Sequence, residues 1–450
     1  MTTDDQLRRV LGPVRATALV VGTIIGTGVF LKPGKMGALL GDSGLVLAAW
    51  VVAAILSVAG ALTYAELGAR MPEAGGEYAY LRTAYGRFPA FMFGWMRFWI
   101  GSPGSIAAFG VGTATFLAVI LPVEAVWPGG IAGLAVTFIA ALTLLNVVTV
   151  SIGSGVQTAL TALKIVAVLG LAATLFVLGR SPDAPLATSA TLAEPPRFAA
   201  FVAAVVAALW AFDGWNNMPM VGGEVKNPRR NIPLALIAGM AVVTALYLFA
   251  DRAYFAVLTE GEVAGAGVAK VPVATTALQA ATGATGLPVM IMSLVFVVSA
   301  LGAMTGSILT GARVPYAMAK DGLFLASFAR IGATTRVPAV SVVVQGVVAC
   351  VLALSGSFDE LTEAVVFASW IFYGLTAAAL FRVRRLGVGA DAAYRTPLWP
   401  VMPLLFIAVA GVLLLTTVFN EPALSALGCG MLAIGVPVYL VFVRKAATTT

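Results

Sequence analysis

Twelve long apolar runs occupy most of this 450-residue chain and constrain its fold more than any other feature. Most of them are close to the roughly 20 residues that a helix needs to cross a bilayer, although the ninth is short and the third is long enough to predict a tilted helix. The chain is 60% hydrophobic and only 10% charged, whereas soluble domains carry roughly 25% charged residues. Lipid offers no hydrogen-bond partners, so each span must satisfy its own backbone, as an α-helix does. The sequence therefore predicts an all-α membrane protein with spans at about 14–36, 45–69, 88–121, 128–148, 155–179, 198–220, 231–258, 287–312, 338–354, 359–381, 398–418 and 423–444.

Basic residues predict the orientation of the spans, because cytoplasmic loops carry an excess of Lys and Arg. With both termini placed inside, 19 of the 27 basic residues fall inside, six fall outside and two lie within spans. The net charge of +7 then follows from topology and gives no reason to expect a nucleic-acid partner. Histidine is absent and Cys350 and Cys429 lie in or near spans, so we expect no metal site, no cofactor and no disulfide framework. We see no cleavable signal peptide before the first span.

Two spans are interrupted near their middles, the first by Gly22-Thr23-Ile24-Ile25-Gly26-Thr27-Gly28 and the sixth by Phe212-Asp213-Gly214-Trp215-Asn216-Asn217. A Lys and a Pro follow each break, at an offset of nearly 195 residues. Paired interruptions of this kind are typical of the mid-membrane site of a transporter, since lipid tolerates unwound backbone only where it lines a cavity. Because each repeat has five spans, an odd number, the second repeat would begin on the opposite side of the membrane from the first, so the two repeats would be inverted. We expect one transporter domain over 1–450. It would consist of inverted repeats at 14–179 and 198–381 and of two further helices at 398–444.

The first break suits a zwitterion. Its glycines let a ligand approach the backbone closely. The amides of Thr27 and Gly28 would begin the second half-helix and attract a carboxylate, while carbonyls such as that of Ile24 would end the first half-helix and attract a cation. An α-amino acid carries both charges. The alternative is that these small residues only allow close helix packing.

The second break contains Asp213, an acid near the predicted centre of its span, where such residues usually face a wet cavity. It would contact the ammonium of a ligand, accept a proton, or simply cap the loose amides of the break. Trp210 and Trp215 flank the break, either as packing residues or as lids over a ligand.

Three further charged residues lie within or near spans. Lys164 is mid-span, too deep to reach either interface, and must point inward. Its ammonium, surrounded by carbonyls and hydroxyls, would stand in for a bound cation; the alternative is a structural ion pair with Asp213 or Glu66. Glu66 and Arg97 lie nearer the ends of their spans, so we expect structural or gating roles for them.

Several stretches together resemble the amino acid–polyamine–organocation superfamily, and within it the L-type amino acid transporters and the bacterial serine/threonine and alanine-serine-cysteine exchangers. The likeness covers nearly the whole chain. It rests on Gly22 to Phe30, Ala65-Glu66-Leu67-Gly68, Met71-Pro72-Glu73-Ala74-Gly75-Gly76-Glu77-Tyr78, Phe212 to Asn216, Gly223 to Pro233, Thr310-Gly311-Ala312-Arg313 and Ala319-Lys320-Asp321-Gly322.

The resemblance implies a leucine-transporter-like fold of 12 helices in a 5+5 inverted repeat, with helices 1 and 6 discontinuous. It implies that the substrate carboxylate meets the amides of Thr27 and Gly28, and that its amino group meets the carbonyls of Ile24, Trp210 and Asp213. Trp210 would be the aromatic gate, and Lys164 would occupy the place of sodium. The substrate-binding residues expected in this way are Ile24, Ile25, Gly26, Thr27, Gly28, Trp210, Ala211, Phe212, Asp213 and Gly214, with Glu66, Arg97 and Trp215 as gating or structural residues.

Two departures from the resemblance bear on specificity and partners. Asp213 stands where the animal L-type proteins have Gly, so the side-chain subsite would be narrower or more favourable to a cation. The loop around 122–129 lacks the cysteine that links the animal proteins to a heavy chain. We therefore expect no disulfide-linked partner, a monomer or weak homo-oligomer, and a prokaryotic plasma membrane.

These observations predict a secondary transporter of neutral L-amino acids, independent of sodium and working by exchange. The main alternative is a proton-coupled or cation-selective carrier of basic amino acids or polyamines, with Asp213 or Glu66 as the titrating group. A non-transporting amino acid sensor is a further alternative. An enzyme is not expected, because the membrane charges show no catalytic motif.

Overall fold

The computed structural model describes residues 7–148, 150–182, 198–332, 335–355, 358–420 and 422–448. Nearly all of them are helical, and within these ranges extended pairing is limited to two isolated bridges. The α-helices are α1 (Pro13–Ile24), α2 (Gly28–Leu40), α3 (Ser43–Arg70), α4 (Glu77–Tyr85), α5 (Arg87–Met96), α6 (Ser102–Ala118), α7 (Val123–Val126), α8 (Gly130–Val148), α9 (Val150–Leu178), α10 (Phe198–Phe212), α11 (Asn217–Met220), α12 (Pro228–Val257), α13 (Glu260–Val268), α14 (Val273–Thr282), α15 (Gly286–Gly311), α16 (Arg313–Lys320), α17 (Ala339–Ser355), α18 (Phe358–Arg385), α19 (Val401–Asn420) and α20 (Pro422–Thr448). Shorter turns are the π-helical η2 (Arg97–Gly101) and the 3₁₀-helical η3 (Gly222–Glu224) and η4 (Ala326–Ala329).

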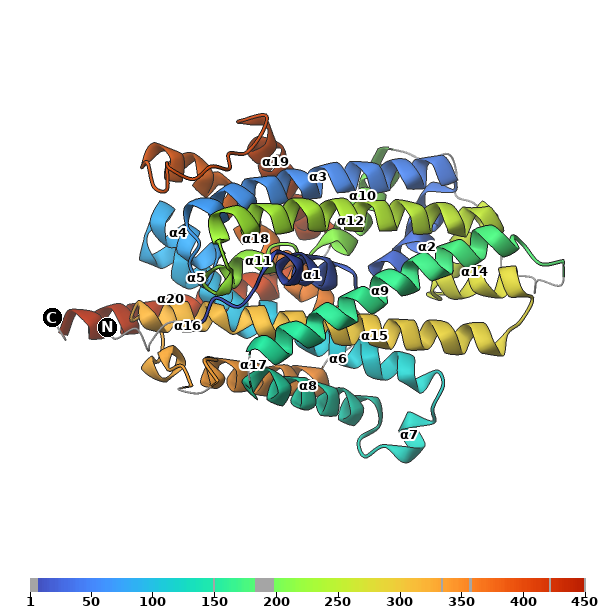
Figure 1. Cartoon of the computed structure of the whole chain (residues 1–450), viewed down its shortest axis with the longest axis horizontal. Helices are drawn as coiled ribbons and strands as arrows, with labels where there is room; N and C mark the ends of the chain where they lie inside the picture. The colour runs from blue at the N-terminus through green and yellow to red at the C-terminus, as the bar shows by residue number, and fades with distance from the viewer. Residues whose placement is uncertain are drawn as a thin grey trace.

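The long helices run along the long axis of the molecule and form a bundle (Figure 1). Ten helical spans within the described residues are long and apolar enough to cross a membrane. An eleventh, α17, is apolar but only 17 residues long, and the tenth predicted span corresponds to the 28-residue helix α18. The predicted all-α fold with twelve membrane helices is therefore confirmed. The expected link between the two repeats, 180–197, lies mostly outside the described residues.

Helices that are five spans apart in the sequence pack against each other. Helix α3 packs on α12, α6 on α15, and α8 on α17. Figure 1 shows α3 and α12 side by side along most of their length. This pairing agrees with a five-plus-five organisation of the bundle.

Two spans are broken at the positions that the sequence predicts. Helix α1 ends at Ile24 and α2 begins at Gly28, while α10 ends at Phe212 and α11 begins at Asn217. Glycine in both breaks weakens the helix, because it gains the most conformational freedom when the helix unwinds. Helix α10 packs on α2 and α11 contacts α1, so the two breaks face each other inside the bundle.

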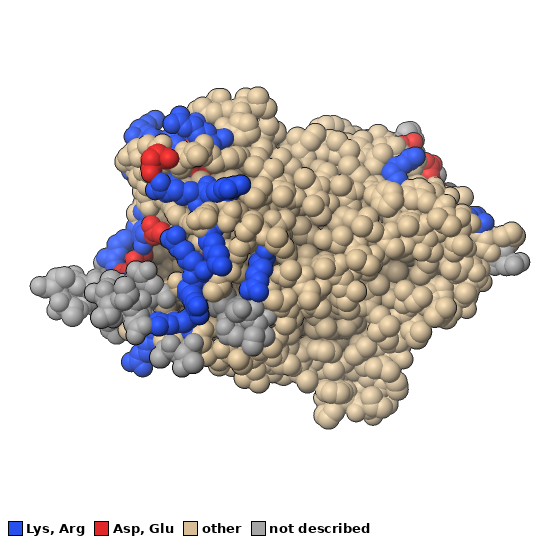
Figure 2. All heavy atoms as spheres, in the orientation of Figure 1, with Lys and Arg blue, Asp and Glu red and all other residues tan. Residues whose placement is uncertain are grey.

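Charged side chains gather at one end of the bundle. Figure 2 shows most of the visible Lys and Arg side chains at the end where Figure 1 places α4, α16 and the close of α20. We call this the basic end. Most of the rest of this face is uncharged, as contact with lipid requires.

A buried ion pair joins the segments next to the basic end. Arg313 donates to Glu224 through Nε at 2.6 Å and through Nη2 at 3.1 Å, and both side chains are fully buried. The carbonyl of Glu224 also accepts hydrogen bonds from the amides of Val10 and Leu11, at 2.9 and 3.0 Å. The segment before α1, the turn η3 and the start of α16 are thus held together.

Candidate functional site

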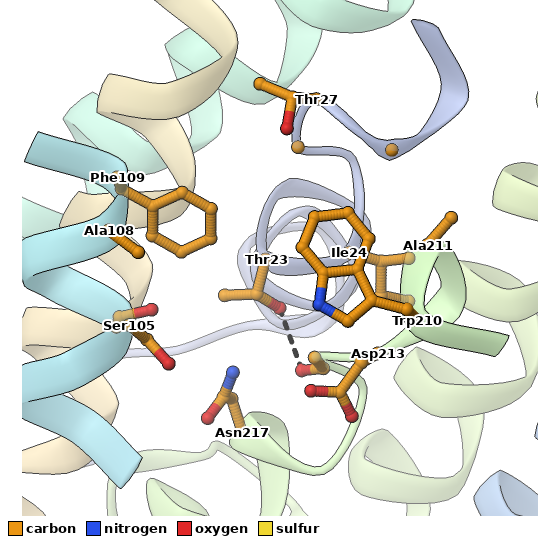
Figure 3. A pocket seen from close by; sticks show the side chains of 14 residues that line it. Thr23, Ile24, Thr27, Ser105, Ala108, Phe109, Trp210, Ala211, Asp213 and Asn217 are labelled. Carbon is orange, nitrogen blue, oxygen red and sulfur yellow. Dashed lines mark hydrogen bonds between the residues drawn. The ribbon is translucent and has the colours of Figure 1, made fainter. Parts of the chain in front are cut away.

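The two breaks enclose a small cavity of about 70 Å³ (Figure 3). In Figure 3 the rings of Phe109 and Trp210 stand on opposite sides of this space, with Ser105, Asp213 and Asn217 at one end of it. Drug-sized ligands occupy pockets of roughly 300–1,000 Å³, so this cavity suits a small polar solute. It is lined by Thr23, Ile24, Gly26, Thr27, Gly28, Ser105, Ala108, Phe109, Trp210, Ala211, Asp213, Gly214, Asn217 and Ser307.

Thr27 and Gly28, at the start of α2, line the cavity. Thr27 is the N-cap residue, and its side chain makes no capping hydrogen bond. The first turn of a helix has unpaired N–H groups and a partial positive charge, which favour an anion. Gly28 lets this end approach α10 closely, since a Cβ there would lie 2.7 Å from the Cβ of Ala211.

The end of α1 is held by a buried lysine from α9. Lys164 is 2% exposed, and its ammonium donates to the carbonyls of Gly22 at 2.7 Å and Ile25 at 2.6 Å. The hydroxyl of Ser299, from α15, lies 3.2 Å from the Ile25 carbonyl and 3.0 Å from the Gly26 carbonyl. A positive charge here complements the carbonyl end of the half-helix.

The second break depends on one glycine. Gly214 has a φ of +117°, and a Cβ on it would lie 2.6 Å from the carbonyl oxygen of Thr23. Its own carbonyl oxygen lies 3.0 Å from the hydroxyl of Thr23, the contact drawn in Figure 3. The two breaks are therefore in direct contact, and a larger residue would push them apart.

A tyrosine of α12 bridges the two breaks. The hydroxyl of Tyr247 lies 2.9 Å from the carbonyl of Ala211 and 3.2 Å from the carbonyl of Ile24. These carbonyls end α10 and α1, respectively, so a single phenol holds both half-helices at once. Apolar sequence surrounds this tyrosine, and no pattern in the sequence distinguishes it.

Aromatic and polar side chains fix the remaining residues of the second break. The carboxylate of Asp213 accepts a hydrogen bond from the hydroxyl of Tyr373 at 3.1 Å. The ring of Trp210 faces the ammonium of Lys32, which lies 4.1 Å from the ring centre and makes a cation–π contact. Trp215 does not line the cavity; its ring packs between those of Tyr64, at 4.8 Å, and Phe406, at 5.6 Å.

Eight of the ten expected substrate-binding residues line the cavity, all except Ile25 and Phe212. Ile25 contributes its carbonyl to Lys164, and Phe212 packs its ring on those of Trp50 and Tyr247. Six lining residues were not expected from the sequence. Thr23 and Asn217 belong to the interrupted segments themselves, so the breaks could have signalled them, whereas Ser105, Ala108, Phe109 and Ser307 come from other spans.

The two remaining charged candidates lie away from the lining. Glu66 accepts hydrogen bonds from Arg70 at 2.7 Å and from Arg384 at 2.6 and 2.9 Å. It also accepts the amide of Thr396 at 2.7 Å. Arg97 lies in the π-helical turn and donates to the side-chain carbonyl of Asn217 at 2.9 Å. Arg97 thus contacts a lining residue, whereas Glu66 is held within an arginine cluster.

Two discontinuous helices that face each other across a small polar cavity, inside a bundle of membrane helices, define a secondary transporter of the broken-helix class. The comparison with known families identifies this chain more closely. The model of the family described as "Amino acid permease" matches residues 11–442. The chain belongs to the amino acid permease family.

Individual relatives cover nearly the whole chain. The serine/threonine exchanger SteT of Bacillus subtilis (strain 168) is 32% identical over 451 residues, covering 99% of this chain and 100% of SteT. The b(0,+)-type amino acid transporter 1 of Mus musculus is 29% identical, covering 97% of this chain and 88% of its own. The human cystine/glutamate transporter is 27% identical, covering 97% and 86%.

Proposed function

We propose that the protein exchanges small neutral L-amino acids across the plasma membrane without sodium, by alternating access. The observation that carries this proposal is the position of Lys164, whose ammonium donates to the carbonyls of Gly22 and Ile25. Carbonyls at the end of a half-helix coordinate cations in transporters of this class. A fixed ammonium that already occupies two of them supplies the positive charge, so transport needs no sodium at this point.

The cavity suits the backbone of an amino acid. The substrate carboxylate would lie at the start of α2, against the amides of Thr27 and Gly28. Its ammonium would lie against the carbonyls of Ile24, Trp210 and Asp213, where α1 and α10 end. The ring of Trp210 would close over the bound substrate, and the cavity volume favours a small side chain.

Exchange is supported by the relatives, one of which is named as a serine/threonine exchanger. We propose that residues 14–179 and 198–381 are inverted repeats, and that one group of helices rocks against another about the two breaks. The basic end would face the cytoplasm, with both termini there, because cytoplasmic segments carry the excess of Lys and Arg. The protein would act in a prokaryotic plasma membrane, as a monomer or weak homo-oligomer without a disulfide-linked heavy chain.

One observation favours a second candidate. The carboxylate of Asp213 lies in the cavity lining, where it would attract a cationic side chain. A carrier of basic amino acids or polyamines is therefore the alternative, and an amino acid sensor would use the same cavity without moving substrate. Glu66 is a poor candidate for the titrating group of such a carrier, since two arginines and an amide already bind it.

Reconstitution tests the proposal. The protein in liposomes is assayed for uptake of radiolabelled serine, alanine, leucine, lysine and putrescine in sodium-free buffer, with and without unlabelled amino acid inside. Serine or alanine uptake stimulated by internal amino acid is expected. Uptake that needs sodium would contradict the role of Lys164, and uptake of lysine or putrescine alone would favour the alternative. Binding without uptake would indicate a sensor.

A further inference from the structure

Among the residues whose burial the structure describes, three glutamates have fully buried side chains, and they differ in how their charge is compensated. Glu66 and Glu224 each form ion pairs with arginine at 2.6–2.7 Å. Glu77 forms no ion pair with any described residue: its Oε1 accepts the hydroxyl of Tyr64 at 2.7 Å, and its Oε2 has no hydrogen-bond partner among these residues. A buried carboxylate that forms no ion pair is costly in its charged form, so protonation is more favourable for Glu77 than for the other two glutamates.

Backbone contacts place Glu77 next to α11, the short helix that follows the second break. The amide of Gly75 donates to the carbonyl of Met220, at the end of α11, at 2.8 Å. Gly76 has a φ of +47°, and a Cβ on it would lie 2.8 Å from the amide nitrogen of Met220. Only glycine fits this close approach. The loop before α4 therefore docks on the chain that forms the second break and fixes the first turn of α4 there.

The charged residues that act on Glu77 are next to, or part of, the cavity between the two breaks. Arg97 and Asp213 both act electrostatically on Glu77, with opposite signs. Asp213 lines the cavity, and Arg97 donates to Asn217, which also lines it. The titratable and polar groups around Glu77 come from several elements: Tyr64 of α3, Arg97 of η2, Asp213 and Asn216 of the second break, Tyr373 of α18 and Tyr80 of α4 itself. Asp321, next to α16, is instead paired with Arg82.

Burial raises the pKa of Glu77 to about 7 and outweighs the Arg97 charge and the hydrogen bond from Tyr64, which both lower this pKa. The Asp213 charge raises it further. The carboxyl is protonated below this value and charged above it. When Glu77 is charged, the group of Glu77, Asp213 and Arg97 carries one net negative charge; when Glu77 is protonated, the group is neutral. The charge behind the cavity then changes near neutral pH.

We propose that Glu77 is a proton-binding site of this transporter, and that its proton decides whether the cavity favours neutral or cationic side chains. The effect on substrates rests on the proposed function, because it requires amino acids to bind between the two breaks. Deprotonated Glu77 leaves a net negative charge that attracts a cationic side chain. Protonated Glu77 removes this attraction and leaves the binding of a neutral side chain nearly unchanged.

Proton binding is tested first, without any amino acid. Infrared difference spectra of the purified protein in lipid nanodiscs are recorded between about pH 8 and about pH 6, the range around this pKa. A carboxylic acid band that grows as the pH falls in the wild type, and that is missing in Glu77→Gln, is expected. In Glu77→Asp the band should move to the frequency of an aspartic acid. Glu73→Gln, an exposed carboxylate in the preceding loop, is the matched control and should keep the wild-type band.

Substrate binding is tested second, with serine and lysine as probes. In the wild type the affinity for lysine relative to serine should rise by up to about tenfold from pH 6 to pH 8, as the deprotonated fraction rises from about 0.1 to about 0.9. Glu77→Gln should keep the low ratio at every pH, and Glu73→Gln should follow the wild type. A wild-type band that does not titrate in this range, or a pH-dependent ratio that survives in Glu77→Gln, would overturn the proposal. If neither probe binds at any pH, the proposed function fails, and the infrared titration still decides on Glu77.

Discussion

The two breaks lie in contact, yet they are built from different chemistry. The first break, between Ile24 and Gly28, carries no charged side chain of its own, and a lysine, a serine and a tyrosine from other helices bind its carbonyls. The second break, between Phe212 and Asn217, contains an acid, a tryptophan and an asparagine. The first is a backbone site held by its neighbours, whereas the second presents side chains.

We expect from this difference that the two breaks bind different parts of the substrate. Every α-amino acid has the same carboxylate and ammonium, which a backbone site can bind through helix ends. Amino acids differ in their side chains, which side chains of the protein can distinguish by charge and shape. Changes at the first break should therefore weaken transport of all substrates alike, and changes at the second should alter the ratio between substrates.

The largest effect is expected for Lys164→Ala. The carbonyl of Gly22 loses its lysine donor and that of Ile25 keeps only the Ser299 hydroxyl, and an unsatisfied buried group costs about 1–3 kcal/mol. Exchange of every amino acid should fall to background in proteoliposomes. Lys226→Ala, which removes an exposed lysine, is the control and should transport normally. Full activity of Lys164→Ala in sodium-free buffer would contradict the role of this lysine.

Gly28→Ala should reduce transport next most strongly. The new Cβ would lie 2.7 Å from the Cβ of Ala211 and separate α2 from α10. Overpacking typically costs about 1–3 kcal/mol, so we expect the transport efficiency for serine and leucine to fall by the same factor, roughly 5- to 150-fold. Gly170→Ala on α9, where a Cβ meets nothing within 4 Å, should leave the initial rates unchanged. A fall for one substrate alone would show that the first break also reads side chains.

Tyr247→Phe should have a moderate effect. The hydroxyl that bridges the carbonyls of Ala211 and Ile24 is lost without a change of shape. A hydrogen bond contributes about 0.5–1.5 kcal/mol, so apparent affinity should fall roughly 2- to 12-fold for all substrates. Tyr254→Phe, whose hydroxyl makes a longer contact of 3.4 Å with the carbonyl of Val29, is the matched control for concentration-dependent uptake. Equal behaviour of the two variants would argue against the bridge.

Asp213→Asn should change serine transport least. The amide keeps the shape of the side chain and can still accept the Tyr373 hydroxyl, but the negative charge in the cavity lining is lost. We expect serine exchange within about threefold of the wild type, a difference below 1 kcal/mol. Competition by lysine should weaken relative to competition by serine. An unchanged competition ratio would mean that the second break does not read charge.

The sequence predicts the breaks well because glycine and buried charge are local signals. The helices stop within the predicted segments, and Lys164 is a local signal because a lone charge in an apolar span needs an inward partner. Ser105, Phe109 and Tyr247 could not be found in this way, since small and aromatic residues are ordinary in membrane helices. Their role arises only when α6 and α12 pack against the breaks.

Glu66 and Glu77 show that the sequence also cannot predict how a buried charged residue is paired. Both stand in stretches that carry the family resemblance, and the sequence drew attention to Glu66, which lies within a span. The arginine that compensates Glu66 most fully, Arg384, is 318 residues away in the chain. Arg70, four residues further along α3, also pairs with Glu66, but Arg384 reaches it only through the packing of α18 against α3. Among the described residues, Glu77 has no such ion-pair partner.

The buried pair of Arg313 and Glu224 would make transport sensitive to the salt concentration at the basic end. In the proposed alternating-access cycle that end would open to water, and dissolved ions, which cannot reach the pair while both side chains are fully buried, would then screen both charges. Salt on that side alone would then stabilise the open form and leave the closed form unaffected. Amino acid exchange measured in liposomes with different salt concentrations inside and outside would then show a rate that depends on the direction of the salt difference. The ionic strength of one compartment would thus control the rate of transport.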